Sequence, residues 1–279
     1  MRHITKSYYV NEIPVIEIID ANLEDKAAPL AIFYHGFTGS KDSSMTFGNE
    51  IAKRGFRVIM PDAQHHGERR KYGVDLNVNG ILFFEALMSN VKEFPEIVHF
   101  YRSKELIKDD FIAVAGMSMG GMTTSLILKA NKEVNVAVVL MGSPQQIKFN
   151  DWIVNQYVSH GGEVDQLASN AKTIYEYMTE YFKKYDLGLD PKAINQRPLL
   201  FWHSKQDPVV PYIYAEEFVE AAKNIPEGKY VYLKLDDQGA HKVPFIEMAR
   251  MGEFISAAYN EEVENVYEVA EENFNKLWG

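Results

Sequence analysis

The sequence predicts an α/β protein built on a mostly parallel, doubly wound sheet. Apolar runs of strand length alternate with segments of helical periodicity over residues 29–142, and the alternation resumes at residue 198. Strands that alternate with helices pair in parallel through right-handed crossovers, so helices are expected on both faces of the sheet. A chain of 279 residues can bury the substantial core that such a sheet requires.

Two strands are expected before this alternation begins. Residues 4–10 and 13–19 are apolar or alternate around Asn11 and Glu12, which is typical of an antiparallel hairpin. Residues 29–34 form a continuous apolar strand of the kind buried on both faces. A helix over residues 43–55 and a further buried strand over residues 56–62 follow.

Ser118 lies at the corner between a predicted strand and a predicted helix. The apolar run of residues 111–115 breaks at Gly116, and apolar residues recur at helical spacing from Met119 onwards. A serine between Gly116 and Gly120 in this setting is typical of a nucleophile elbow, a strained turn that lifts the hydroxyl out of the sheet. A side chain at either glycine would collide with the neighbouring strand or with the helix. The alternatives are an ordinary tight turn and a phosphate-binding loop, and the latter fits poorly because the P-loop lysine is missing.

The rest of the chain divides into a core, an insertion and an extension. Residues 77–103 are expected to form a long helix that is interrupted near Pro95, and residues 135–142 a strand. Residues 143–197 carry no strand pattern but repeat aromatic residues at helical spacing, which indicates a cap over a pocket or an extra helical layer on the body. The strand of residues 198–204 is followed by a helix over residues 212–224, and the strand of residues 229–235 by helices over residues 243–258 and 261–278. The predicted division is residues 1–144 and 196–260 as core, 145–195 as helical cap and 261–279 as C-terminal helical extension.

An acid and a base follow the last two strands. Asp207 comes directly after the strand of residues 198–204, and His241 lies on the loop after the last strand. Because the carboxyl ends of parallel strands meet at one edge of the sheet, both side chains are expected near Ser118. The order serine, aspartate, histidine is the one that the α/β-hydrolase pattern requires. Ser118, Asp207 and His241 are therefore the predicted nucleophile, acid and base.

Other residues compete for these roles. The alternatives to Asp207 are Asp236 and Asp237, and those to His241 are His66 and His203, of which His203 is more simply structural. Adjacent His65 and His66 do not predict a metal site, because neighbours in sequence rarely converge on one ion and no third ligand is suggested.

Two backbone N–H groups are the predicted oxyanion donors. Phe37 follows His35 and Gly36 on a glycine-rich loop directly after a strand, and Met119 begins the helix after Ser118. His35 itself is expected to be a buried histidine that holds this loop by hydrogen bonds.

Composition excludes several classes of protein. A net charge of −10 and a pI near 5.3, without any basic stripe, disfavour nucleic-acid and anionic-membrane partners. The absence of cysteine excludes disulfides, thiolate nucleophiles and cysteine-ligated metals. No run reaches membrane-spanning length and the N-terminus has no apolar signal region, so a cytoplasmic protein is expected.

Four segments resemble the α/β-hydrolase superfamily: residues 35–39, 61–67, 116–121 and 203–211. Within it they look most similar to bacterial carboxylesterases of the dienelactone hydrolase and prolyl-oligopeptidase-like branch. The resemblance implies a serine hydrolase with a Ser-His-Asp triad that cleaves small carboxylic acid esters through an acyl-enzyme, without cofactor or metal.

Several alternatives stay open at this point. A cinnamoyl- or feruloyl-type esterase, a small-peptide hydrolase and a non-catalytic binding protein on a hydrolase fold share the same motifs. The residues that bind substrate are not predicted. A homodimer through the cap or the C-terminal extension is also open.

Overall fold

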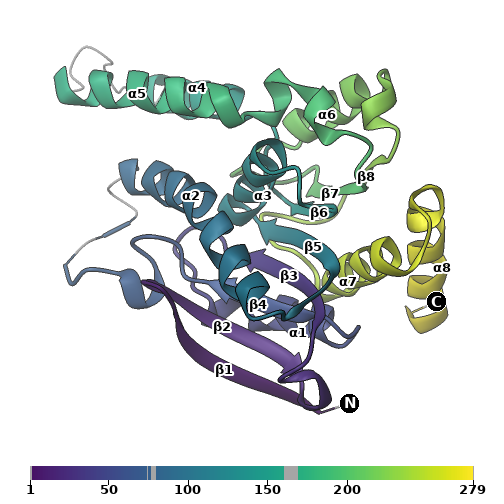
Figure 1. Ribbon diagram of the computed structural model, residues 1–279. Coiled ribbons are helices and arrows are strands. Elements are labelled where there is room, and N and C mark those ends of the chain that lie inside the picture. The colour runs from purple at the N-terminus through teal and green to yellow at the C-terminus, as the bar shows by residue number, and fades with distance from the viewer. Residues whose placement is uncertain (1, 74, 77–79, 160–168, 279) are drawn as a thin grey trace.

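The computed structural model describes residues 2–73, 75–76, 80–159 and 169–278. Within this part of the chain the strands form one eight-stranded sheet in the order β1-β2-β4-β3-β5-β6-β7-β8 (Figure 1). The pairs β1–β2 and β2–β4 are antiparallel, and every later pair is parallel. The predicted sheet with its N-terminal antiparallel strands is therefore confirmed. The strands are β1 His3–Val10, β2 Ile13–Asp20, β3 Ala28–Tyr34, β4 Arg57–Pro61, β5 Ile107–Met117, β6 Val136–Leu140, β7 Leu199–Ser204 and β8 Val231–Asp236.

Helices cover both faces of the sheet. Side chains of β3 alternate between the faces. Leu30 and Ile32 join an apolar cluster with α2 (Ile81–Ser103) and α3 (Met119–Ala130), whereas Ala31 and Phe33 join a second cluster with α1 (Met45–Ala52) and α7 (Phe245–Asn260). A strand buried on both sides must be apolar throughout, as β3 is. The helices are α1 Met45–Ala52, α2 Ile81–Ser103, α3 Met119–Ala130, α4 Gln146–Ser159, α5 Ser169–Tyr185, α6 Ile213–Lys223, α7 Phe245–Asn260 and α8 Val266–Trp278.

The predicted interruption of the long helix at Pro95 is wrong. Helix α2 runs without a break from Ile81 to Ser103 with Pro95 inside it. Proline removes one backbone donor, so the Val91 carbonyl one turn earlier loses its partner. Pro95 is exposed, so its ring faces solvent and displaces no packed side chain of the core. The predicted start of this helix, residues 77–79, lies outside the described residues.

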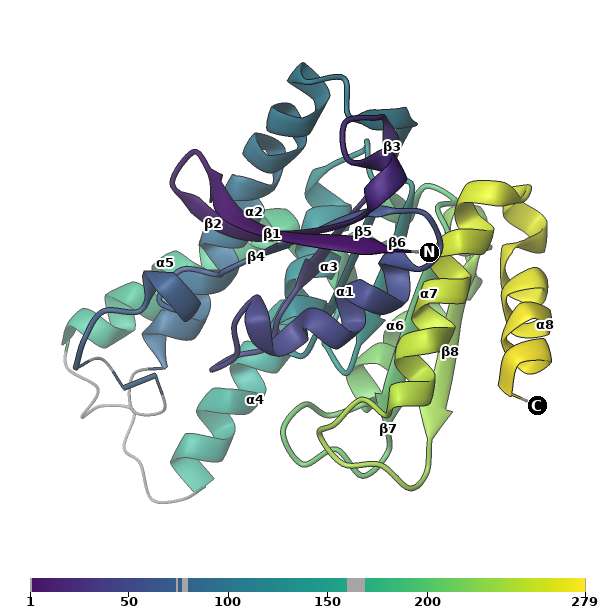
Figure 2. The same cartoon turned by 90° about the horizontal axis from the view of Figure 1, so that it is seen from below.

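The C-terminal extension packs on the body of its own chain. Helix α8 lies beside α7 (Figure 2), and Val266, Ala270 and Phe274 are buried on one side of α8. Leu277, near the end of α8, lies outside this buried side, because 64% of its surface is exposed. A homodimer through the extension stays a prediction.

The insertion is helical, as predicted, and part of it packs on the body. Helices α4 and α5 belong to it, whereas residues 160–168 between them lie outside the described residues. Phe149, Met178 and Phe182 are buried in the same cluster as the side chains of β3 and α3. The division into core, cap and extension stays a prediction.

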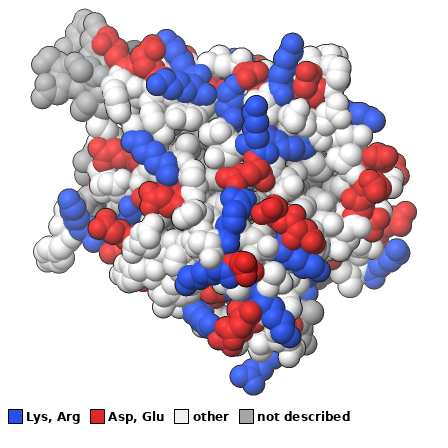
Figure 3. Space-filling view, in the orientation of Figure 1, with Lys and Arg blue, Asp and Glu red and all other residues white. Residues whose placement is uncertain are grey.

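The surface carries charges of both signs. Lysine and arginine are interspersed with aspartate and glutamate over the face shown in Figure 3. That face therefore offers no large field of one sign to attract an anionic polymer. Among the helices in the described part of the chain, none combines the length and apolar character needed to cross a membrane.

Candidate active site

Ser118 occupies a strained turn between β5 and α3. Its φ of 54° and ψ of −118° lie in a region that non-glycine residues rarely adopt. Two backbone hydrogen bonds fix this conformation. The Ser118 N–H donates to the Leu140 carbonyl of β6 at 2.8 Å, and the Ser118 carbonyl accepts the Met122 N–H of α3 at 3.0 Å. The turn lies at the carboxyl edge of the sheet, where open α/β sheets bind ligands.

The two glycines around Ser118 allow the helix to cross close to the sheet. A Cβ atom on Gly116 would lie 2.3 Å from the Gly120 carbonyl oxygen, and one on Gly120 would lie 2.0 Å from the Tyr34 carbonyl oxygen. Both contacts are with backbone, so no change of rotamer relieves them. The predicted collisions with the helix and with the neighbouring strand are confirmed.

The structure brings Ser118, His241 and Asp207 into one chain of contacts. His241 Nε2 lies 2.8 Å from Ser118 Oγ, and His241 Nδ1 lies 2.7 Å from Asp207 Oδ2. A carboxylate only accepts hydrogen bonds, so Nδ1–H donates to Asp207 and Nε2 is left to accept the Ser118 hydroxyl. This is the arrangement in which an imidazole can take a proton from a serine.

The side chain of Asp207 is buried, and both of its carboxylate oxygens are hydrogen-bonded. Its Oδ1 accepts the backbone N–H groups of Val209 at 2.8 Å and Val210 at 3.0 Å, and its Oδ2 lies 3.3 Å from His203 Nε2. Burial alone would raise the pKa of the Asp207 carboxyl, but the hydrogen bonds from His203, His241 and the two backbone groups outweigh it and hold the pKa well below its usual range. Asp207 is therefore ionised at neutral pH and able to stabilise a protonated imidazole.

The competing residues lie in other contacts. Asp237 is exposed and pairs with Lys205 at 2.8 Å, while Asp236 accepts the Gln238 N–H at 2.9 Å. His203 is buried and its Nε2 lies 2.9 Å from the Val210 carbonyl oxygen, so it supports the loop of Asp207.

The adjacent histidines have separate partners. His65 Nε2 lies 2.7 Å from a carboxylate oxygen of Glu85, and His66 Nδ1 lies 2.8 Å from the Gln64 carbonyl oxygen. The described residues contain no group of three His, Asp or Glu side chains arranged to hold a metal ion.

Burial of His66 predicts a loss of stability in acid. Burial lowers the pKa of His66 from 6.5 to about 4. Below pH 6.5 His66 is therefore protonated in the unfolded chain, whereas in the folded chain it stays neutral down to about pH 4. The free energy of unfolding falls between these two pH values. Between pH 7.5 and 4.5 we expect His66→Phe to lose about 2 kcal/mol less unfolding free energy than the parent, measured by urea denaturation.

His99→Gln, a change at an exposed histidine of α2, is the matched control and should follow the parent. Equal losses for His66→Phe and the parent would contradict this origin of the acid sensitivity.

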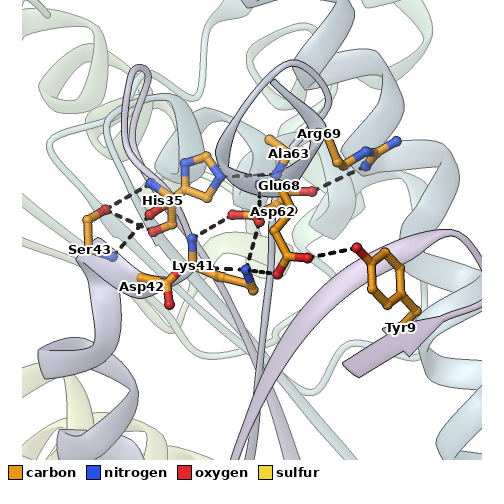
Figure 4. Close-up of polar contacts among 10 residues, drawn as sticks. Tyr9, His35, Lys41, Asp42, Ser43, Asp62, Ala63, Glu68 and Arg69 are labelled. Atoms are coloured by element: carbon orange, nitrogen blue, oxygen red, sulfur yellow. Dashed lines mark hydrogen bonds and ion pairs between the residues drawn. The ribbon is translucent and has the colours of Figure 1, made fainter. Parts of the chain in front are cut away.

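The loop of residues 36–40 is anchored at both ends by residues that follow β4 (Figure 4). His35 Nδ1 lies 2.8 Å from the Gly36 carbonyl oxygen, and the Ala63 N–H donates to His35 Nε2 at 3.0 Å. At the other end, the Lys41 backbone N–H and Nζ donate to the two Asp62 oxygens at 2.8 and 3.0 Å. The interpretation of His35 as a buried histidine that holds its loop is confirmed.

Sequence reasoning missed the buried pair of Lys41 and Asp62. Both side chains are at most 2% exposed, and the pair extends through Glu68 to Tyr9 of β1 (Figure 4). The available signal was an aspartate directly after a buried strand, next to the strand that carries His35. Breaking such a buried pair leaves an uncompensated charge, so both residues matter for the shape of this edge.

The two predicted oxyanion donors lie beside Ser118. Met119 is the first residue of α3, and the first N–H groups of a helix have no acceptor within it. Phe37 lines the same cavity as Ser118. Their role as oxyanion donors stays a prediction.

A cavity of about 450 Å³ opens at Ser118. Its wall combines the loop of Phe37, helix α2, helix α4 and the loop after β7. Among the described residues that line it, Ser118 carries the only hydroxyl and Trp152 an indole N–H, and the other side chains are apolar. The sequence pattern named no substrate-binding residue, and the aromatic repeat in α4 was the available signal. The lining residues are Phe37, Gly80, Phe83, Phe84, Ser118, Met122, Phe149, Trp152, Ile153, Pro208, Val209 and Val210.

Comparison with known proteins gives a family and relatives. The model of the prolyl oligopeptidase family matches residues 51–263. The chain is 32% identical to YitV of Bacillus subtilis (strain 168) over 239 residues, 84% of this chain and 91% of YitV. It is 30% identical to esterase YjfP of Escherichia coli (strain K12) over 200 residues, 72% of this chain and 77% of YjfP. Both relatives carry the word esterase in their names.

Solved structures share the fold. The crystal structure of TT1662 from Thermus thermophilus superposes with a TM-score of 0.68 at 20% identity and covers 96% of this chain and 99% of TT1662.

Proposed function

This chain belongs to the prolyl oligopeptidase family within the α/β-hydrolases, and on that premise we propose that it is a carboxylesterase that cleaves small apolar esters by acyl transfer to Ser118. The single observation that carries the proposal is the run of contacts from Ser118 to His241 to Asp207 at the mouth of an apolar cavity. The names of the two relatives support the same reaction class.

The reaction proceeds in two stages. His241 takes the proton of Ser118 as the serine oxygen attacks the ester carbonyl, and Asp207 orients and stabilises the charged imidazole. The N–H groups of Phe37 and Met119 hold the oxyanion. His241 then protonates the departing alcohol, which leaves an acyl-enzyme, and water attacks that intermediate by the same route.

The lining of the cavity favours esters over peptides. A peptide brings a charged terminus or several polar backbone groups, and burying these without partners costs free energy. The described lining residues offer no charged side chain to pair with such groups. A neutral ester of an apolar acid has no such cost.

The first experiment measures hydrolysis of p-nitrophenyl esters from acetate to decanoate. Each added methylene that enters the cavity contributes about 0.8 kcal/mol, so kcat/KM should rise about fourfold per methylene until the cavity is filled and then fall. Folded protein that releases an amine from short peptides but turns over no ester would contradict the proposal and favour a small-peptide hydrolase.

A second candidate is an esterase of hydroxycinnamic acids, favoured by the rings in the cavity. Phe37 and Phe83 meet edge to face at 5.4 Å, and Phe149 stacks on Trp152 at 5.8 Å between ring centroids. Flat aromatic acids pack well between such rings. A higher kcat/KM for methyl ferulate than for short acyl esters would identify this class.

A further inference from the structure

The Gly36–Phe37 peptide lies against the proposed nucleophile. A Cβ atom on Gly36 would be 3.5 Å from Ser118 Cβ and 3.5 Å from the Met117 carbonyl oxygen. The direction of this one peptide group therefore decides whether the Phe37 N–H can meet an oxyanion on the acyl carbon attached to Ser118.

We propose that His35 is a positioning residue that turns the Gly36–Phe37 peptide so that its N–H points to the oxyanion. This inference rests on the proposed acyl-transfer function. A trans peptide is planar, and its C=O and N–H point in opposite directions. Holding the Gly36 carbonyl oxygen therefore aims the Phe37 N–H. Two donors hold that oxygen, His35 Nδ1 at 2.8 Å and the Gly39 N–H at 3.0 Å.

The protonation of His35 is set by its other ring nitrogen. Nε2 accepts the Ala63 N–H at 3.0 Å, so in the neutral ring the proton resides on Nδ1, where it is donated to the Gly36 carbonyl. Burial lowers the pKa of His35, whose surface is 2% exposed, and this keeps the ring neutral. The donation also polarises the peptide, which makes the Phe37 N–H a stronger donor.

A second contact, between Lys41 and Asp62, fixes the other end of the loop of residues 36–40. Thr38 has a φ of 64°, a left-handed conformation that few residues adopt, so this turn needs support from outside. The Lys41 N–H, three residues further on, is tied to the buried Asp62 at 2.8 Å (Figure 4). His35 and Asp62 thus hold the two ends of the loop of residues 36–40. Of these two residues, only His35 donates to the Gly36 carbonyl, which belongs to the same peptide group as the Phe37 N–H.

Two substitutions separate the two hydrogen bonds of His35. In His35→Asn the amide nitrogen is as many bonds from Cβ as Nδ1 is, so it can still donate to the Gly36 carbonyl. In His35→Gln the amide oxygen is as many bonds from Cβ as Nε2 is, so it can still accept from Ala63 while the donor to Gly36 is lost. His35→Asn removes the acceptor of the Ala63 N–H, and His35→Gln removes one of the two donors to the Gly36 carbonyl, so each variant breaks one buried hydrogen bond of the parent.

The experiment measures ester turnover and labelling of Ser118 by a fluorophosphonate. In the labelling step the serine oxygen bonds to phosphorus, fluoride leaves and the serine proton departs through His241, while the phosphoryl oxygen occupies the position of the oxyanion. We expect His35→Gln to lower both kcat and the labelling rate constant by roughly 10²-fold with KM little changed, which is the scale of losing one oxyanion donor. His35→Asn should retain most of both rates.

Equal rates for the two variants, or a loss confined to KM, would overturn the role of His35. If His35→Gln does not fold, His35→Leu removes the same donor without burying an unpaired amide, and the same loss is expected. A parent that is labelled at Ser118 but hydrolyses no ester overturns the proposed function alone, because the labelling rates still test His35. A folded parent that is not labelled overturns both.

Discussion

Substitution of Ser118 by alanine should lower kcat by about 10⁶-fold and leave the fold intact, since removal of a hydrolase nucleophile costs on that order. The Ser118 hydroxyl supplies the nucleophilic oxygen of the proposed mechanism, and no cysteine can replace it because the chain has none. The strained backbone at φ 54° is held by hydrogen bonds from β6 and α3 that alanine keeps. Any residual rate would come from binding and the oxyanion donors.

The loss of kcat is measured with the p-nitrophenyl ester that the parent hydrolyses fastest, and the intact fold is checked by urea denaturation. Ser125→Ala is the matched control, because Ser125 is a buried serine of α3, the helix that follows Ser118. Its hydroxyl donates to the Gly121 carbonyl. This control variant should keep the activity of the parent. Substantial turnover by a clean preparation of Ser118→Ala would remove Ser118 from the mechanism.

Asp207→Asn should lower kcat by about 10⁴-fold through the tautomer of His241. The backbone N–H groups of Val209 and Val210 both donate to Oδ1, so the asparagine must place its amide oxygen there. Its NH₂ group then faces His241, whose Nδ1 has to accept instead of donate. The remaining proton lies on Nε2, which can no longer take a proton from Ser118.

Asp237→Asn is the control for this second prediction. Asp237 is an exposed aspartate that directly follows β8 and pairs with Lys205. Both variants are compared by kcat at pH 7.5 and by unfolding free energy. Loss of kcat in Asp237→Asn, with Asp207→Asn active, would transfer the role of the acid to the loop after β8.

Several features of the fold follow from the sequence because they depend on neighbours in the chain. The strand, turn and helix around Ser118 are set by a short apolar run, two glycines and a helical repeat. The hairpin before the sheet follows in the same way from alternation around Asn11 and Glu12. Pro95 was misjudged because its tolerance depends on solvent exposure within the folded helix, which the local pattern does not contain.

By itself the sequence determined the elements, their order along the chain and the candidates Ser118, Asp207 and His241, since periodicity and glycine sterics act over a few residues. Only the tertiary structure decided which aspartate reaches His241, which segments enclose the cavity and which ring nitrogen of His35 carries the proton. Each of these depends on contacts between residues far apart in the chain, such as His35 with Ala63 or Phe37 with Phe83. A hydrogen bond or a cavity wall exists only once folding has brought its separate parts within a few ångströms of one another.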